Sequence, residues 1–322
     1  MKDNEIKKKF KLFDMNRDGR GVEKGEDGPK NFKNFFKYFG RKFSKLLSVN
    51  LVMIMMVLPI IISVMVSIMG PTTPSSGSVL FPTLYGASFI ADSPAVDILM
   101  SVHSIQIFVP VYNSYAYYII GALIAFLVIT FGWQNVGSMY LLRNMVRGDA
   151  VFIMSDYFYA IRKNKRQGFI MGLIDCAAIF ILIIDFIFFY NQGGTYLLDV
   201  MYVVVVALIF VYIIMRTYIY LQIVTFNLSL WKMIKNAFIF TALGIKRNIM
   251  AFLGILIIAA VNIALIFLLA PLNIILPLVL PLFYFLATSG FIFTYAAYPV
   301  IEKYMIEPDL QTSHDETIED QE

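Results

Sequence analysis

The sequence predicts an all-α protein, a polytopic transmembrane bundle of about six helices with amphipathic interfacial helices on its cytoplasmic side. Of the 322 residues, 59% are hydrophobic and only 15% are charged, against about 25% charged residues in soluble domains. The charged residues also crowd the two ends of the chain. Finally, the sequence contains six apolar runs, each long enough to cross about 30 Å of hydrocarbon as a helix.

The apolar runs define the expected domain organisation. We expect spanning helices near residues 46–69, 115–141, 169–190, 197–222, 249–270 and 278–300. A basic cytoplasmic segment with an interfacial helix (1–45) precedes this membrane domain (46–300), and an acidic cytoplasmic tail (301–322) follows it. The longest outer segment, 70–114, is expected to cap the bundle, re-enter the membrane or contact an extracellular protein, since long loops are often functional.

Lysine and arginine predict the orientation, because loops on the cytoplasmic side retain positive charge. Residues 1–45 hold 14 of the 26, and the segments 142–168, 223–248 and 301–322 hold 6, 4 and 1. The remaining one, Arg216, lies inside a span, and the outer segments hold none. Both termini are therefore expected in the cytoplasm. Topology and attraction to anionic lipid also account for the net charge of +4, so the bilayer and not nucleic acid is the expected partner.

Three inner segments share one layout, in which an aromatic amphipathic stretch precedes basic residues, an asparagine and a span. They are residues 34–43, 156–166 and 236–248. Each is typical of a helix lying at the membrane surface. One interpretation is an internal repeat of three hairpins, each preceded by an interfacial helix. The alternative is that basic juxtamembrane segments commonly look alike.

Six stretches of the chain carry a resemblance to a known family: Gly19-Arg-Gly-Val22 with Lys24, Phe39-Gly-Arg-Lys-Phe43, Val151-Phe-Ile-Met-Ser-Asp156 with Lys163, Asn164 and Gln167, Ile223-Val-Thr-Phe-Asn-Leu-Ser-Leu230, Leu243-Gly-Ile-Lys-Arg-Asn248 and Tyr298-Pro-Val-Ile-Glu-Lys-Tyr304. In these stretches the chain resembles the YesL-like family of bacterial integral membrane proteins. The resemblance covers nearly the whole chain, although segment 70–114 is longer than expected of the family. It implies a bacterial cell (plasma) membrane location and an accessory role beside a carbohydrate ABC transporter, with permease subunits or a sugar-binding protein as partners.

Two ionisable residues lie at membrane depth, where such residues are costly and mark candidate functional sites. Asp175 is six residues into the third span and Arg216 is six residues before the inner end of the fourth. Both therefore lie about 9 Å from the inner boundary, on helices that form a hairpin. We expect an ion pair between them. It could lock the hairpin or line a polar path, or Arg216 could extend to the headgroups instead.

Two further sets of residues lie on the same helices. Gly168 and Gly172 form a small-xxx-small pattern that permits close helix packing, with Asp175 on the packed side. Asp185 and Asp199, near the outer ends of the two spans, are candidates for an acidic outer mouth. The alternative for these two carboxylates is ordinary hydration at the interface.

The sequence offers no complete catalytic, metal or cofactor motif. Asp14-Met-Asn-Arg-Asp-Gly19 fits the opening of an EF-hand loop, but Gly25 stands where the bidentate glutamate is required. His103 and His314 are expected on opposite sides of the membrane, so they cannot share a metal with Cys176. Phosphate-binding glycine loops are absent from the inner segments. We therefore expect no enzymatic activity, no metal and no cofactor.

Two functions fit these observations. The first is a non-enzymatic accessory or assembly protein, since few buried polar residues are available to line a sugar path. The alternative is a transporter or channel for a small solute through its own bundle, with Asp175, Arg216, Asn262 and Thr294 as candidate lining groups. Neutralising Asp175 and Arg216 together separates the two hypotheses, because only a transporter should lose flux while remaining folded.

Overall fold

The structure is a computed structural model that describes residues 30–69, 72–76, 80–90, 93–103, 106–110, 114–192, 194–272 and 276–308. Six of its helices are long and apolar enough to cross a membrane. They are α1 (Phe32–Met69), α4 (Ser114–Arg147), α6 (Lys165–Asn191), α7 (Tyr196–Thr225), α9 (Ile245–Leu269) and α10 (Leu276–Ile301). The predicted all-α bundle is confirmed, and the chain is a multi-pass membrane protein. The predicted calcium-like loop and His314 lie outside the described residues.

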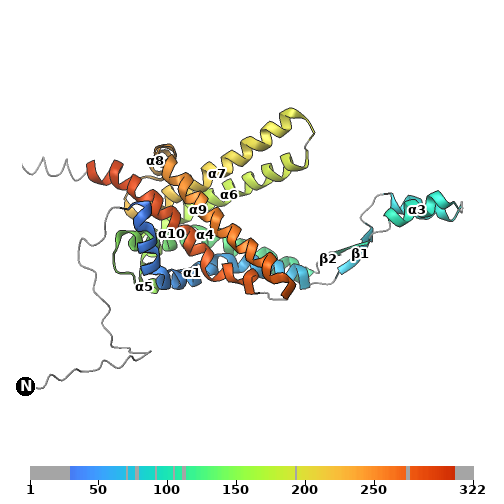
Figure 1. Cartoon of the computed structure of the whole chain (residues 1–322), viewed down its shortest axis with the longest axis horizontal. Coiled ribbons are helices and arrows are strands. Elements are labelled where there is room, and N and C mark those ends of the chain that lie inside the picture. The colour runs from blue at the N-terminus through green and yellow to red at the C-terminus, as the bar shows by residue number, and fades with distance from the viewer. Residues whose placement is uncertain are drawn as a thin grey trace, which may run out of the picture.

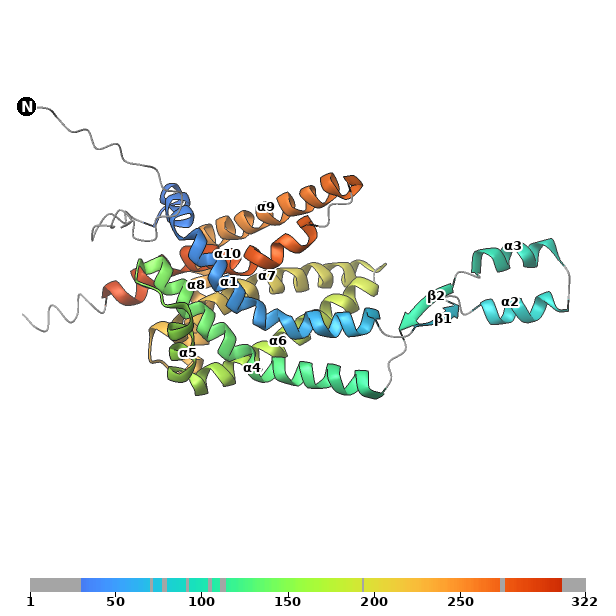
Figure 2. The ribbon, with the colours of Figure 1, turned by 90° about the horizontal axis from the view of Figure 1, so that it is seen from below.

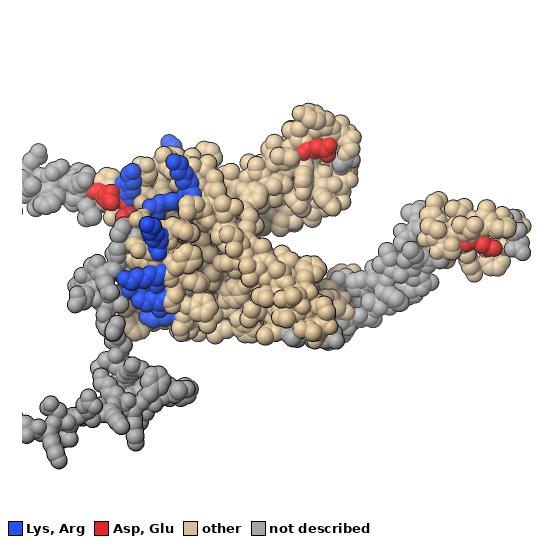
Figure 3. Space-filling model, viewed as in Figure 1, with Lys and Arg blue, Asp and Glu red and all other residues tan. Residues whose placement is uncertain are grey.

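The bundle consists of three helical hairpins, in which α1 packs on α4, α6 on α7, and α9 on α10. Lys and Arg side chains gather at one end of it (Figure 3). The first and last described segments meet at this end, where Lys30 Nζ lies 2.9 Å from Glu302 Oε2. Glu302 begins a short π-helical turn, Glu302–Ile306, which continues α10.

Two of the three predicted interfacial helices are separate elements at the basic end. They are α5 (Ile153–Lys163) before α6 and α8 (Leu230–Leu243) before α9. Asn164 and Gly244 each end the short helix and begin the long one. The third, residues 34–43, is not a separate element, because these residues form the start of α1 itself. The helix is continuous through Gly40, but Figures 1 and 2 show its first turns lying at a steep angle to the part that runs along the bundle.

α5 is held against α4 by an aromatic contact. The Tyr157 ring covers Gly137, where an added Cβ would lie 2.4 Å from the ring. Asp156 caps the amino end of α5, because its Oδ2 accepts a hydrogen bond from the Phe152 N–H at 2.8 Å. Burial raises the pKa of the Tyr157 hydroxyl to about 12, so this side chain is neutral at physiological pH.

The well-packed core occupies the half of the bundle nearest the basic end. Its largest buried side chains come from the start of α1, the last turns of α4 and α7, and α10, and include Leu46, Leu142, Tyr218, Tyr220 and Phe291. Towards the other end the hairpins separate, and Figure 1 shows the α6–α7 hairpin diverging from the rest. Side chains there are apolar and exposed, as expected where lipid is the solvent.

The described parts of the outer segment, residues 72–76, 80–90, 93–103 and 106–110, project away from the bundle at the end opposite the basic residues (Figures 1 and 2). Strands β1 (Thr72–Ser76) and β2 (Gln106–Pro110) pair antiparallel. Beyond them, α2 (Phe81–Ser88) and α3 (Pro94–His103) pack on each other. We call residues 72–110 the outer stalk. In this position it does not cover the bundle, and the other two expectations for the segment stay predictions.

Candidate functional site

The site is centred on Asp175 of α6, whose side chain is fully buried. The carboxylate faces Arg216 of α7: Arg216 Nη2 lies 2.9 Å from Oδ2, and Nε donates to Oδ2 at 3.0 Å and to Oδ1 at 3.2 Å. The ion pair expected from the depths of the two residues is therefore present. Arg216 points into the bundle, so its extension to the headgroups is not observed.

Two tyrosines of α7 complete the coordination of Asp175. The Tyr212 hydroxyl donates to Oδ1 at 2.7 Å, and the Tyr220 hydroxyl donates to Oδ2 at 2.8 Å. Tyr212, Arg216 and Tyr220 are spaced by four residues, which places them on one face of the helix. Both carboxylate oxygens are thus satisfied by donors from a single helix. This satisfaction is what a buried carboxylate requires, because its desolvation is costly without strong partners.

Helix α4 contributes the third side of the site. Asn135 Oδ1 accepts a hydrogen bond from Arg216 Nη2 at 3.0 Å, and Asn135 Nδ2 donates to the Phe131 carbonyl at 2.8 Å. The Arg216 guanidinium also lies 5.3 Å from the centroid of the Phe131 ring, a geometry that favours cation–π attraction. We call Asn135, Asp175, Tyr212, Arg216 and Tyr220 the Asp175 cluster; it joins α4, α6 and α7.

The backbones of α4 and α6 touch just beside the cluster. A Cβ added to Gly132 would lie 1.9 Å from the Gly168 carbonyl oxygen and 2.7 Å from the Gly172 Cα. The predicted packing residues Gly168 and Gly172 are therefore both at a helix crossing, opposite a third glycine. Only glycine fits at this approach, which brings α4 close enough for Asn135 to reach Arg216.

The remaining predicted residues lie apart from the cluster. Asn262 of α9 donates a hydrogen bond to the Tyr284 hydroxyl of α10, and Thr294 donates to the Gly290 carbonyl at 2.7 Å. Asp185 is partly exposed and Asp199 exposed, and Figure 3 shows acidic side chains at the outer end of the α6–α7 hairpin. Among the described residues neither carboxylate has an ion pair. Their role as an outer mouth stays a prediction.

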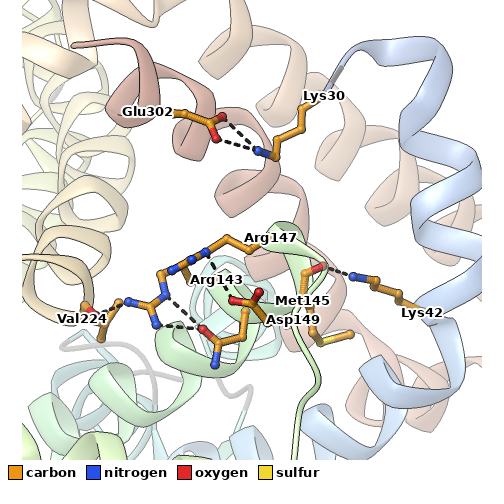
Figure 4. A network of polar contacts seen from close by, with 9 residues as sticks. Lys30, Lys42, Arg143, Met145, Arg147, Asp149, Val224 and Glu302 are labelled. Atoms are coloured by element: carbon orange, nitrogen blue, oxygen red, sulfur yellow. Dashed lines mark hydrogen bonds and ion pairs between the residues drawn. The ribbon is translucent and has the colours of Figure 1, made fainter. Parts of the chain in front are cut away.

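A second polar network, at the basic end, was missed by the sequence reasoning. Figure 4 shows Arg143 donating to the Val224 carbonyl of α7, with Arg143 Nη2 2.8 Å from Asn144 Oδ1. Lys42 donates to the Met145 carbonyl, which joins α1 to α4. Arg143 is only 7% exposed, although its sequence context suggested a cytoplasmic charge. The available signal was its position only two residues after an apolar run predicted to end at residue 141.

The chemistry available at the Asp175 cluster is limited by its closure. Both carboxylate oxygens are bound by protein donors, and the guanidinium is bound through Nε and Nη2, with 25% of the Arg216 side chain exposed. In the described part of the chain, no group of three or more His, Cys, Asp or Glu side chains could hold a metal ion. Cys176 follows Asp175 and is a free thiol. The arrangement joins α4, α6 and α7 through polar contacts.

Comparison with known proteins gives no further assignment: no family model, no curated protein and no solved structure matches this chain.

Proposed function

We propose that this protein is a non-enzymatic accessory or assembly protein of the bacterial cell membrane, with both termini in the cytoplasm. Its partner would be a carbohydrate ABC transporter, through permease subunits or a sugar-binding protein. The observation that carries the accessory role is the outer stalk, a pair of helices held away from the bundle. The carbohydrate partner follows from the YesL-like resemblance alone.

The tip of the outer stalk has the composition of a protein-binding surface. Within the described residues α2 and α3 contain no buried side chain. Phe89 and Ile90 are 75% and 89% exposed, and Tyr85 is 50% exposed. Exposed aromatic and aliphatic side chains of this kind are typical of binding sites. The Asp175 cluster supports the same proposal, because Asp175 and Arg216 neutralise each other and join three helices of the bundle.

Removing the outer stalk should abolish partner recovery without unfolding the bundle. Thr72 and Pro110 are opposite each other in the β1–β2 ladder, so residues 73–109 can be replaced by a short Gly-Ser linker. We expect affinity purification from native membranes, followed by mass spectrometry, to recover permease subunits or a sugar-binding lipoprotein with the full chain. With the shortened chain, recovery should fall by at least about tenfold, as for loss of binding hot spots.

A milder variant localises the contact on the stalk. Phe89→Ser with Ile90→Ser should reduce partner recovery as strongly as the deletion, whereas Thr83→Ala, at an exposed position of α2, should leave it unchanged. Full-chain protein that purifies alone would contradict the accessory proposal. That result would favour the transporter alternative. The next measurement would then be solute flux through the variant in which Asp175 and Arg216 are neutralised together.

The proposed orientation predicts which engineered thiols react from outside intact cells. Because Cys176 is the single native cysteine, Cys176→Ala gives a thiol-free background. A membrane-impermeant maleimide should label Thr83→Cys in α2 of intact cells, and should label Lys232→Cys in α8 only after the membrane is permeabilised. The reverse pattern would place the basic end outside the cytoplasm, against the retention of positive charge inside.

A further inference from the structure

An apolar groove lies at the basic end of the bundle, between the start of α1, α9 and α10. Its volume is about 420 Å³. Its walls include Phe32 and Phe36 of α1, Met250 and Ile257 of α9, and Ile292 of α10, while Arg247 and Lys30 line one end. The groove therefore combines a long hydrocarbon surface with positive charge at a single end.

The groove runs along α9 for a length that suits an acyl chain. The lining residues of α9 extend from Arg247 to Ile258, a rise of about 16 Å along the helix. Gly254 lies on this path, and a Cβ placed on it would meet no atom closer than Ile292 at 4.0 Å. The glycine thus leaves an open depression on the face of α9. Phe32 and Phe36, each 62% exposed, stand at the rim of the groove.

The charged end of the groove is suited to a phosphate group. Arg247 Nη1 donates to the Lys30 carbonyl at 3.1 Å, and within the described residues its Nε and Nη2 have no hydrogen-bond acceptor. A guanidinium held in this way can present its remaining donors to a phosphate. Lys33 and Lys246, both exposed, add positive charge nearby, and the Lys30 ammonium is already paired with Glu302.

The position of Arg247 matches the depth at which lipid phosphates occur. It is the third residue of α9, and it belongs to the end of the bundle where basic side chains gather (Figure 3). That end meets the headgroups of one leaflet, because the apolar length of α9 begins immediately after it. A phosphate at this depth would have its acyl chain pointing along the groove towards the membrane centre.

We propose that this groove is a specific binding site for one anionic phospholipid, with its phosphate at Arg247 and one acyl chain along α9 over Gly254. The lipid would fill the space between the aromatic start of α1 and the α9–α10 hairpin. It would thereby fix the angle at which the start of α1 leaves the bundle. This inference does not depend on the accessory role, since it concerns a lipid site and not a protein partner.

The test is native mass spectrometry of delipidated full-length protein titrated with phosphatidylglycerol or phosphatidylcholine. We expect one tightly bound phosphatidylglycerol per chain and weaker phosphatidylcholine binding. Arg247→Gln should weaken phosphatidylglycerol binding about tenfold, the effect of losing one charge-assisted pair. Arg162→Gln, which removes the same charge at an exposed position of α5, should change it less than about twofold.

A second variant blocks the apolar half of the site and leaves the charge intact. Gly254→Leu should also weaken phosphatidylglycerol binding, and the open space at Gly254 lets this variant fold even if Arg247→Gln does not. Glycerol phosphate, which lacks acyl chains, should not compete. The proposal is overturned by equal affinity for the two lipids, by unsaturable binding of many lipids, by unchanged binding to Gly254→Leu, or by effective competition from glycerol phosphate.

Discussion

Replacing Asp175 by alanine should lower the free energy of unfolding by about 3–5 kcal/mol, because Arg216 would remain in the bundle without its counter-ion. The loss extends beyond one pair, since the Tyr212 and Tyr220 hydroxyls would also lose their acceptor. Asp185→Ala is the matched control: it removes a partly exposed carboxylate from the same helix and should cost less than about 0.5 kcal/mol. Thermal unfolding in detergent, followed by size-exclusion chromatography, measures both effects.

A double-mutant cycle distinguishes a lock from a functional charge. Asp175→Leu combined with Arg216→Met removes both charges and keeps apolar volume, so it should be more stable than Asp175→Leu alone. If the pair is a structural lock, this double variant should also retain partner recovery. A double variant that is less stable than either single change would show that the two residues act independently, which the observed geometry does not allow.

The Asp175–Arg216 pair could be predicted because it depends only on depth and on two helices that are adjacent in sequence. Asn135 could not, since it belongs to α4 and nothing in the local sequence states that α4 crosses α6 at Gly132. Tyr212 and Tyr220 lie four residues before and after Arg216, so the sequence could have placed both on the same face of the helix as Arg216. Tyrosine is common in membrane helices, however, and spacing alone does not distinguish a hydroxyl ligand from a lipid-facing ring.

Hydropathy located the spans, but it did not predict how far each helix continues beyond its apolar run. The predicted first span began at residue 46, whereas α1 begins at Phe32. A helix continues past polar side chains at the membrane surface, and it ends only where the backbone leaves helical geometry. Asn164 and Gly244 provide such breaks before α6 and α9, and Gly40 does not. The outer stalk was predicted only as a long segment, because its form depends on pairing between residues that are 30 to 38 positions apart.

The crossing of α4 and α6 should be the position most sensitive to a single added methyl group. Gly132→Ala would place a Cβ 1.9 Å from the Gly168 carbonyl oxygen, a distance that forces the two backbones apart. Both helices form the core, so we expect a cost of at least about 3 kcal/mol, at the upper end for overpacking. The separation would also stretch the bond between Asn135 and Arg216, one helical turn further along α4.

Gly121→Ala on the same helix is the control, because a Cβ there meets no atom within 4 Å. It should stabilise the protein by up to about 1 kcal/mol, since alanine is the better helix former. The opposite signs expected at Gly132 and Gly121 separate packing from helix propensity, because the chemical change is identical. Equal effects at the two positions would mean that the backbone contact between α4 and α6 does not limit stability.

Trp133 reports on the same contact directly. Its Nε1 donates to the Lys165 carbonyl at 2.8 Å, and its ring lies 5.6 Å from the Phe169 ring of α6. The chain has two tryptophans, so Trp231→Phe leaves Trp133 as the only one. In that background Gly132→Ala should shift the Trp133 emission, whereas Gly121→Ala should not. A loss of stability with unchanged emission would place the damage elsewhere in the bundle, since separating α4 from α6 cannot leave this indole in the same environment.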